Sequence, residues 1–259
     1  MQGICSLASG SKGNSFYIGT SQTKILIDAG ISIQTLQKRL EEIDVNIADI
    51  NAILISHEHI DHIRSVSVLS AKYNIPLFTN SETAKAIISL LPGPFKFKIF
   101  STEEYFYFQD LKIFPFSIQH DALDPVAFIV EIGSIKIGVC TDLGFVTSLT
   151  KKYLEKCTYL ILESNHEVNL VHASSRSTIY KRRVLSRMGH LSNDDCGKLL
   201  QNIFHTELRH VMLAHLSAEC NRHDLALHKI KIHCSEIANP ETLSIAYQDQ
   251  IGKKLFFKP

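Results

Sequence analysis

The sequence predicts an α/β protein in which mixed β-sheets are flanked by helices. Three features of its 259 residues support this fold class: short apolar runs typical of strands, segments with apolar residues at helical spacing, and hairpin turns among the strands. Hairpins together with strand-helix units indicate mixed sheets. The composition agrees, because 45% hydrophobic residues and a net charge of +1 exclude a disordered chain.

The first part of the chain alternates between strand and helix signals. Apolar runs predict strands at Phe16–Ile18, Lys24–Asp28, Ala52–Ile55 and Ile75–Thr79. Apolar residues at helical spacing predict helices at Ile33–Ile43, Ser65–Tyr73 and Ser81–Leu91. The turn residues Gly19–Gln22 join the first two strands as a hairpin, and Pro92-Gly93-Pro94 ends the last of these helices.

The remainder is β-rich at first and then alternates again. Strands are expected at Tyr105–Phe108, Leu111–Ile118, Ala127–Ile132, Ile135–Cys140, Tyr159–Leu162, His210–Ala214, Leu243–Tyr247 and Lys254–Phe257. Helices are expected at Thr178–Arg187, Asp194–His205 and Asp224–Ile237. Because no linker or fixed-period repeat divides the chain, we expect a single domain over residues 1–259.

The sequence also predicts the compartment. No run approaches the roughly eighteen apolar residues of a membrane span, and Met1–Ser6 lacks the basic and apolar regions of a secretory signal. The six cysteines are scattered and form no C-x-x-C pair. We therefore expect reduced thiols in a cytoplasmic protein with no membrane partner.

The segment His57-x-His59-x-Asp61-His62 directly follows an apolar strand. Its donors are too polar to bury without a partner, and histidine is the commonest metal ligand. Because residues two apart point to one side of an extended chain, His57 and His59 can bind one ion. Asp61 and His62 can reach a second ion, as in hydrolytic centres with two metals. The alternative is a hydrophilic loop of surface histidines, which the dense spacing disfavours.

Further motifs extend in order from residue 9 to about residue 221. They are Ser9-Gly10-Ser11-x-Gly13-Asn14-Ser15, Leu26-Ile27-Asp28-Ala29-Gly30, His120-Asp121-Ala122-x-Asp124-Pro125, Thr141-Asp142-Leu143-Gly144, Glu163-Ser164-Asn165-His166, Gly189-His190-Leu191-Ser192-Asn193 and Ala214-His215-Leu216-Ser217. With them, the sequence resembles the metallo-β-lactamase fold superfamily and, within it, the YycJ (WalJ) group. The resemblance implies a four-layer αββα sandwich of two mixed sheets flanked by helices.

The resemblance also implies a ligand set for two divalent ions. The expected ligands are His57, His59 and His120 for one metal, Asp61, His62 and His215 for the other, and Asp142 as the bridge. His120, Asp142 and His215 each follow a predicted apolar strand. Loops at strand ends can together form one site at the edge of the sheets. Histidine and carboxylate ligands suit either Zn²⁺ or Mn²⁺.

Two neighbours of these ligands have other expected roles. By the resemblance, Asp28 orients the histidine loop, which is a usual need of metal sites. Cys140 lies two residues before Asp142 and could be imagined as a thiolate ligand, but a buried strand cysteine is the preferred interpretation.

Two segments are candidates for substrate contacts. The loop Ser9–Ser15 can present backbone N–H groups to an anion, with a plain tight turn as an equal alternative. The segment Arg176–Arg187 holds five cations and no acid, so it can contact nucleic-acid phosphates or simply form a solvated helix face. Within it, Tyr180 can stack on a base or fill the core. The expected substrate contacts are Ser9, Ser11, Asn14, His166, Arg182 and Arg183.

The resemblance implies a metal-dependent phosphodiester hydrolase, specifically a 5′-to-3′ DNA exonuclease with a metal-bridging hydroxide as nucleophile. Asp61 and His190 are the expected catalytic residues, and His190 would bind the scissile phosphate or protonate the leaving oxygen. The expected partner is nucleic acid, with DNA ends preferred over RNA. Two alternatives stay open: a hydrolase of thioesters, lactams or small phosphodiesters, and a nucleic-acid-binding regulatory module without catalysis.

Overall fold

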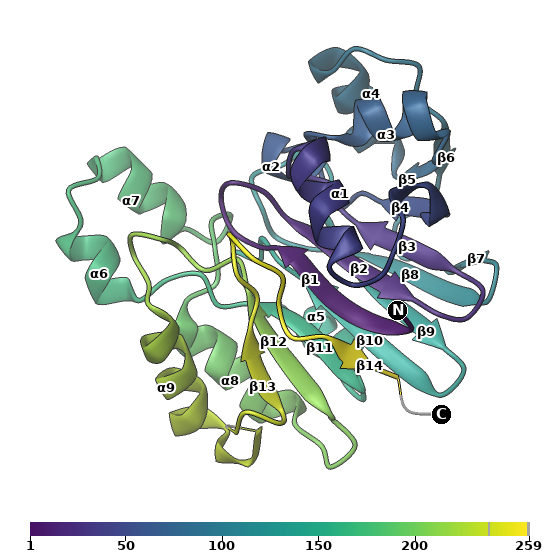
Figure 1. Cartoon of the computed structure of the whole chain (residues 1–259). Coiled ribbons are helices and arrows are strands. Elements are labelled where there is room, and N and C mark those ends of the chain that lie inside the picture. The colour runs from purple at the N-terminus through teal and green to yellow at the C-terminus, as the bar shows by residue number, and fades with distance from the viewer. Residues whose placement is uncertain (238, 258–259) are drawn as a thin grey trace. The chain divides into compact units, whose positions relative to one another are not determined.

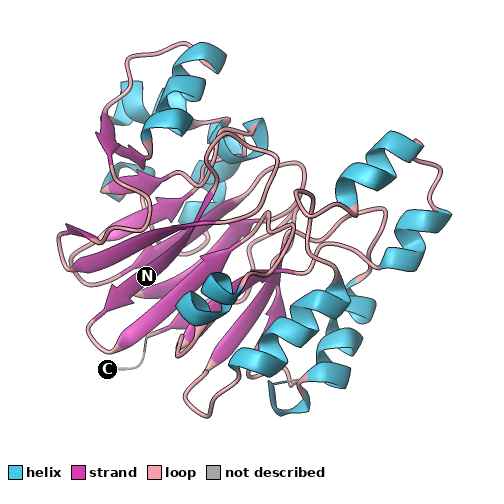
Figure 2. Ribbon diagram, turned by 180° about the vertical axis from the view of Figure 1, so that it is seen from behind, coloured by secondary structure: helices cyan, strands magenta, loops and turns pink. Residues whose placement is uncertain are grey.

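The computed structural model describes residues 1–237 and 239–257, drawn from opposite sides in Figures 1 and 2. The chain forms two compact units. The first comprises residues 1–111, 122–126 and the carboxyl-terminal stretch from residue 246, and the second comprises residues 112–121 and 127–245. A single domain over residues 1–259 stays a prediction.

A seven-stranded mixed sheet forms the centre of the first unit. Its strand order is β14 (Leu255–Phe256), β1 (Gly3–Ala8), β2 (Ser15–Gly19), β3 (Lys24–Ile27), β4 (Ala52–Leu54), β5 (Leu77–Thr79) and β6 (Phe97–Ile99). The pairs β14/β1, β1/β2 and β2/β3 are antiparallel, whereas β3/β4, β4/β5 and β5/β6 are parallel. The change at β3 follows from the connections, because a hairpin joins β2 to β3 and helices join the later strands.

Helices of the first unit bury the apolar stripes that the sequence predicts. They are α1 (Ile33–Glu41), α2 (Ile60–Ile63), α3 (Val66–Tyr73), α4 (Ser81–Leu90) and the 3₁₀ turn Ile47–Asp49. Leu36 and Leu40 of α1 are fully buried in one cluster with Leu26 of β3 and Ile53 of β4. The helix begins at Ser32, whose side chain accepts a hydrogen bond from the amide of Thr35.

The second sheet also has seven strands and is mixed. Its order is β13 (Leu243–Ile245), β12 (His210–Ala214), β11 (Tyr159–Glu163), β10 (Ile135–Cys140), β9 (Val126–Ile132), β8 (Leu111–Ser117) and β7 (Phe106–Phe108). The strands β10 to β13 run parallel to one another, and β9 is antiparallel to β10. Since the carboxyl ends of β10, β11 and β12 meet at one edge, residues that follow these strands gather there.

The helices of the second unit follow its parallel strands. They are α5 (Ser148–Leu154), α6 (Val168–Ala173), α7 (Thr178–Val184), α8 (Asn193–Ile203), α9 (His223–His233) and the 3₁₀ turn Ser235–Ile237. As expected for a capped helix, α8 begins where the Ser192 side chain accepts from the amide of Asp195. The helices α6 and α7 lie beside each other and project from this sheet in both views (Figures 1 and 2).

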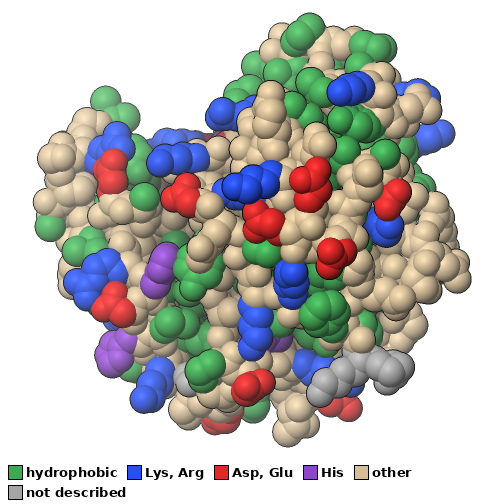
Figure 3. Space-filling model, viewed as in Figure 1, with side chains coloured by type: hydrophobic (Ala, Val, Ile, Leu, Met, Phe, Trp, Pro, Cys, Tyr) green, Lys and Arg blue, Asp and Glu red, His purple; other side chains and the backbone are tan. Residues whose placement is uncertain are grey.

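The predicted fold class of two mixed sheets flanked by helices is confirmed. Five helices and strands of the described residues were not predicted, namely β1, β6, α2, α5 and α6, and neither was the 3₁₀ turn Ile47–Asp49. Asp61 and His62, which were expected in a loop, lie in α2. All six cysteines are free and buried thiols, and among the described residues no helix is long and apolar enough to cross a membrane. Basic and acidic side chains are interspersed on the face in Figure 3, in agreement with the net charge of +1.

Candidate metal centre

In the first unit, the predicted histidine loop follows the end of the interior strand β4. His57 and His59 precede α2, and His62 lies within that helix. His57 and His62 are buried, with ring centroids 4.1 Å apart, and the rings of His57 and His59 lie edge to face at 4.6 Å. Three imidazoles from one short segment thus lie close together, which suits metal binding better than a solvated loop.

The buried carboxylate of Asp28 contacts this loop, and the orienting role that the resemblance implies for it stays a prediction. Its Oδ2 atom lies 2.7 Å from Nδ1 of His62 and accepts from the hydroxyl of Ser56 at 2.8 Å, while Oδ1 accepts from the Ser56 amide. The Ser56 hydroxyl is also 3.0 Å from Nδ1 of His57. A carboxylate on Nδ1 favours the tautomer of His62 that carries its proton there and presents the Nε2 lone pair.

The glycine-containing loop packs against the histidine loop from the other side. The Asn14 amide group, which is fully buried, donates to Asp61 Oδ2 at 3.3 Å and lies 3.0 Å from Nε2 of His62. Its carbonyl oxygen accepts from the amide of Gly10, so both ends of the side chain are engaged. These contacts give Asn14 a positioning role, and its role in substrate binding stays a prediction.

Gly30 shows how closely the end of β3 approaches the same loop. A Cβ atom at Gly30 would collide with the backbone carbonyl of Asp61. The carbonyl of His62 accepts from the amide of Ala29, and that of Asp61 accepts from the amide of Asn14. The backbone of the histidine loop is therefore held by main-chain contacts that leave no room for a side chain at position 30.

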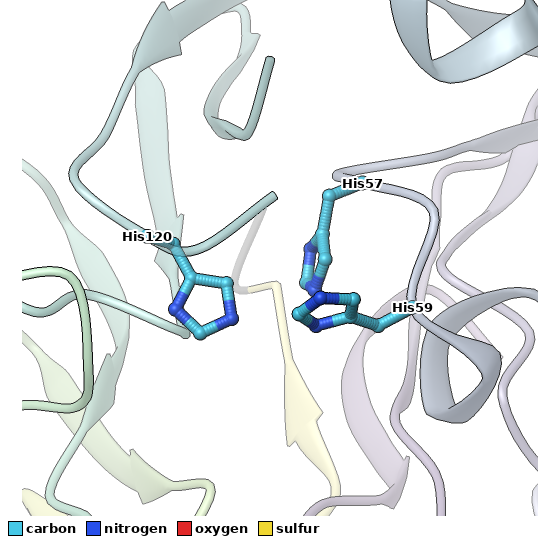
Figure 4. A group of neighbouring side chains, drawn as sticks. All are labelled: His57, His59 and His120. Carbon is cyan, nitrogen blue, oxygen red and sulfur yellow. The ribbon is translucent and has the colours of Figure 1, made fainter. Parts of the chain in front are cut away.

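In the second unit, the predicted ligands follow three alternate strands of the sheet, β8, β10 and β12. His120 follows β8, Asp142 follows the end of β10, and His215 directly follows β12; Figure 4 draws His57 and His59 on the loop after β4 and His120 on the loop after β8. Ligand atoms of Asp142, Glu163, His190 and His215 all lie within 4.8 Å of one another. The sheet edge therefore brings together two carboxylates and two imidazoles, a donor set that suits Zn²⁺ or Mn²⁺.

His120 extends this cluster. Its Nε2 atom lies 3.6 Å from Oδ1 of Asp142 and 3.3 Å from Oδ1 of Asp121, and its Nδ1 atom lies 3.0 Å from the carbonyl of Gly189. Burial lowers the pKa of His120 below its ordinary value, although the nearby carboxylates act in the opposite direction. A neutral ring that donates from Nδ1 to the carbonyl presents the Nε2 lone pair toward the two carboxylates, as a cation ligand would.

Two of the ligand candidates have unusual backbone conformations. Asp142 and His215 adopt left-handed conformations with φ of 57° and 55°. Residues other than glycine rarely occupy this region, and such residues cluster at functional sites. The two turns redirect the chain immediately after β10 and β12.

The sequence prediction missed Glu163 as a site residue. This fully buried carboxylate ends β11, and its Oε1 atom lies 2.8 Å from Nδ1 of both His190 and His215. Burial alone would raise the pKa of Glu163, but the charges and hydrogen bonds of these two histidines hold it well below its usual value. A glutamate that ends an otherwise apolar strand was the available signal, because a carboxylate at such a position needs buried partners.

The other predicted residues have mixed surroundings. His166 is buried, and its pKa is lowered to about 4 mainly by that burial. Arg183 forms a two-point ion pair with Asp121, whereas Arg182 and Ser11 are exposed and Ser9 is buried. Their predicted contacts with substrate are not tested by these positions.

Cys140 is fully buried in β10, and burial raises the pKa of its thiol well above the ordinary value. The nearby carboxylates of Glu163 and Asp142 act in the same direction. These surroundings favour the neutral thiol and agree with the interpretation of a buried strand cysteine.

Comparisons with known proteins agree with this geometry. Residues 23–216 match the family described as "Beta-lactamase superfamily domain". The chain is 35% identical over 223 residues to "Exodeoxyribonuclease YycJ" of Bacillus anthracis, covering 85% of this chain and 84% of that protein. It is 35% identical over 227 residues to "Exodeoxyribonuclease WalJ" of Streptococcus pneumoniae serotype 2, covering 85% and 83%.

Solved structures match the fold at lower identity. The metallo-β-lactamase fold protein YhfI from Bacillus subtilis superposes with a TM-score of 0.71 at 16% identity, covering 97% of this chain and 99% of that chain. Zn²⁺-bound PqqB from Methylobacterium extorquens gives a TM-score of 0.69 at 13% identity, covering 96% and 98%. At these identities the likeness concerns the fold alone.

Proposed function

The chain belongs to the beta-lactamase superfamily, and from that membership we propose that it is a metal-dependent phosphodiester hydrolase that degrades DNA from its ends. The resemblance drawn from the sequence motifs is thereby confirmed at the level of the family. The observation that carries the proposal is the cluster of Asp142, Glu163, His190 and His215 within 4.8 Å. Relatives named exodeoxyribonucleases support DNA as the substrate, and the 5′-to-3′ direction is the polarity we propose.

We propose two divalent ions, Zn²⁺ or Mn²⁺, as the cofactors. The proposed ligands are His57, His59 and His120 for one ion, Asp61, His62 and His215 for the other, and Asp142 for both. The donor chemistry fits, because neutral imidazoles oriented through Nδ1 and buried carboxylates are the ligands these ions take. When bound, such ions supply Lewis acidity toward phosphoryl oxygens and lower the pKa of water.

Buried carboxylates next to these ligands fix the orientation of the imidazoles. Asp28 and Glu163 each accept the Nδ1 proton of a candidate ligand, so the imidazoles need not reorient when a cation arrives. The ring of His190 is also oriented by a carboxylate, since its Nδ1 atom lies 2.8 Å from Oε1 of Glu163. A carboxylate at Nδ1 enables an imidazole to take and give a proton at Nε2, and we propose that His190 gives one to the leaving oxygen.

Substrate binding is proposed for the loop Ser9–Ser15, for His166 and for the basic segment Arg176–Arg187. The overall charge of +1 gives no general attraction for a polyanion, so local cations must supply it. The cytoplasm is the proposed compartment, because six free thiols suit a reducing environment.

A paired substitution tests the proposal. Asp142 and Asp44 both have φ of 57°, and asparagine tolerates this conformation, so Asp142→Asn and Asp44→Asn change charge without adding backbone strain. We expect Asp142→Asn to lower the rate of DNA hydrolysis by about a hundredfold or more, because it removes the charge of a carboxylate that lies 3.4 Å from His215 and 3.6 Å from His120. The exposed Asp44 serves as the control, and its variant should retain wild-type activity.

The substrates decide between the proposal and its alternatives. End-labelled single-stranded and duplex DNA, with and without a 5′-phosphate, should be degraded from the 5′ end in the presence of Mn²⁺ or Zn²⁺. RNA and a panel of small esters, thioesters and phosphodiesters should react more slowly. Turnover of the small substrates alone would instead favour a small-molecule hydrolase, and DNA binding without turnover would favour a regulatory module.

A further inference from the structure

The two neighbouring arginines of α7, Arg182 and Arg183, differ in their contacts. Both are exposed. The guanidinium of Arg183 donates to both oxygens of Asp121, from Nε to Oδ2 at 2.5 Å and from Nη2 to Oδ1 at 3.1 Å. For Arg182, no ion pair is found with any residue in 1–237 or 239–257. The charge of Arg183 is therefore already compensated within the protein, whereas that of Arg182 faces solvent.

Asp121 connects Arg183 to His120. Its Oδ1 atom accepts from Arg183 and lies 3.3 Å from Nε2 of the buried His120. The same segment reaches the other nitrogen of that ring, because Nδ1 of His120 lies 3.0 Å from the carbonyl of Gly189. A Cβ atom at Gly189 would collide with the backbone carbonyl of Arg183, so the end of α7 packs tightly against this turn. The turn after α7 thus contacts His120 at Nδ1, and Asp121, the partner of Arg183, lies beside its Nε2 atom.

We infer that Arg183 is a positioning residue for His120, acting through Asp121, and that it is not a substrate contact. The inference rests on the proposed metal centre, in which His120 is a ligand. A guanidinium that holds both carboxylate oxygens fixes the plane of the carboxylate, and that carboxylate lies beside the ligand nitrogen. Groups in this outer position commonly change metal affinity tenfold or more when removed. Arg182 remains the phosphate contact of the pair.

The adjacent arginines provide matched variants for the test. Titration of the metal-free full chain with MnCl₂ should show that Arg183→Ala raises the dissociation constant for Mn²⁺ about tenfold. Arg182→Ala should leave that constant within about twofold of wild type. Because a half-exposed ion pair contributes little to stability, the melting temperature should stay the same in both variants.

For DNA binding, Arg182→Ala should have the larger effect and Arg183→Ala the smaller one. Binding of a labelled single-stranded oligonucleotide, measured in EDTA over a range of salt concentrations, should weaken in Arg182→Ala. The slope of log affinity against log salt should also fall by about 0.7, the value for one lost phosphate contact. Arg183→Ala should bind the oligonucleotide within about twofold of wild type.

A double-mutant cycle tests whether Arg183 acts through Asp121. In the background of Asp121→Asn, the further change Arg183→Ala should have almost no effect on Mn²⁺ affinity, and Arg183→Lys in the wild type should restore it only in part. Additive effects of the two substitutions, or an unchanged Mn²⁺ affinity in Arg183→Ala, would overturn the inference. Metal binding is read without substrate, so failure of the protein to degrade DNA would refute the nuclease proposal alone. A wild-type chain that bound neither Mn²⁺ nor Zn²⁺ would refute both.

Discussion

Substituting glutamine for Glu163 should lower the metal affinity of the candidate ligand His215 without changing that histidine itself. The carboxylate is fully buried and accepts four hydrogen bonds. Oε1 faces Nδ1 of His190 and of His215, each at 2.8 Å, and Oε2 accepts from the amides of Leu143 at 2.6 Å and Leu191 at 3.1 Å. All four partners are therefore donors when the histidines carry their protons on Nδ1.

A glutamine at this position has one acceptor oxygen and one donor amide group. The two backbone amides cannot become acceptors, so the oxygen must face Leu143 and Leu191 and the amide group must face the histidines. His190 and His215 must then accept at Nδ1, which moves the proton of each ring to Nε2. A protonated Nε2 has no lone pair, so His215 in this tautomer cannot bind a metal ion through that atom.

The hydrogen bonds of Glu163 determine how much metal affinity the substitution should cost. Each hydrogen bond to a charged group contributes about 1.5–3 kcal/mol, so restoring the original tautomer against the amide would sacrifice a comparable energy per ring. We therefore expect the affinity for Zn²⁺ or Mn²⁺ to fall about 10- to 100-fold in Glu163→Gln, equivalent to about 1.4–2.7 kcal/mol. Calorimetric titration measures the affinity, and long-range ¹H–¹⁵N spectra of the histidine rings report the tautomer.

Glu167→Gln is the matched control. Glu167 lies four residues further along at a partly exposed position, where its nearest cation, Lys229, is 3.9 Å away. Its variant should change metal affinity by less than about twofold, since an ion pair at 3.9 Å contributes little and, among the described residues, no hydrogen bond or ion pair joins Glu167 to a candidate ligand. The reasoning is refuted if Glu163→Gln keeps wild-type affinity, or if His215 keeps its proton on Nδ1.

Three further outcomes are expected. Gly30→Ala should lower the free energy of unfolding by about 1–3 kcal/mol in denaturant titrations followed by circular dichroism, because its methyl group collides with the carbonyl of Asp61; an unchanged midpoint would contradict this. Burial lowers the pKa of His166 from 6.5 to about 4, so the unfolded chain binds its proton more readily and stability falls as pH drops from 6.5 toward 4. In EDTA, His166→Gln should remove about 2–4 kcal/mol of that decline, and an unaltered slope would count against the assignment. The Cys140 thiol should react with Ellman's reagent only after unfolding, and rapid labelling of the native protein at this position would show that it is accessible.

The elements that sequence reasoning predicted are those with a strong apolar period. The run Ala52–Ile55 and the stripe through Leu36 and Leu40 reappear as β4 and α1 because burial of those side chains decides the local structure. The edge strand β6 was missed because Lys98 and Ile99 are exposed and its pairing depends on β5 alone. The short helix α5 has the sequence Ser148-Leu149-Thr150-Lys151-Lys152-Tyr153-Leu154, which carries no clear apolar stripe, and it begins at the cap Thr147.

Sequence spacing alone could predict the proximity of site residues only where those residues belong to one short segment of the chain. The histidines of the loop after β4 are adjacent in the chain, and their proximity follows from that spacing. The convergence of Asp142, Glu163 and His215 depends instead on the parallel register of three strands, in which Cys140 pairs with Leu162 and Glu163 with Ala214. Register is a tertiary property, so only the resemblance to a family predicted Asp142 and His215 together, and nothing predicted Glu163.

Asp28 in the first unit and Glu163 in the second make the same kind of contact with a candidate metal ligand. Each is a fully or almost fully buried carboxylate at a strand end, and each lies within 2.8 Å of Nδ1 of a candidate ligand. A buried anion without such partners would cost several kcal/mol, so each carboxylate and its histidine stabilise each other before any cation binds. The orientation of the imidazoles is therefore built into each unit by its own core. If this argument holds, Asp28→Asn should shift the tautomer of His62 just as Glu163→Gln shifts that of His215, although no residue is shared between the two networks.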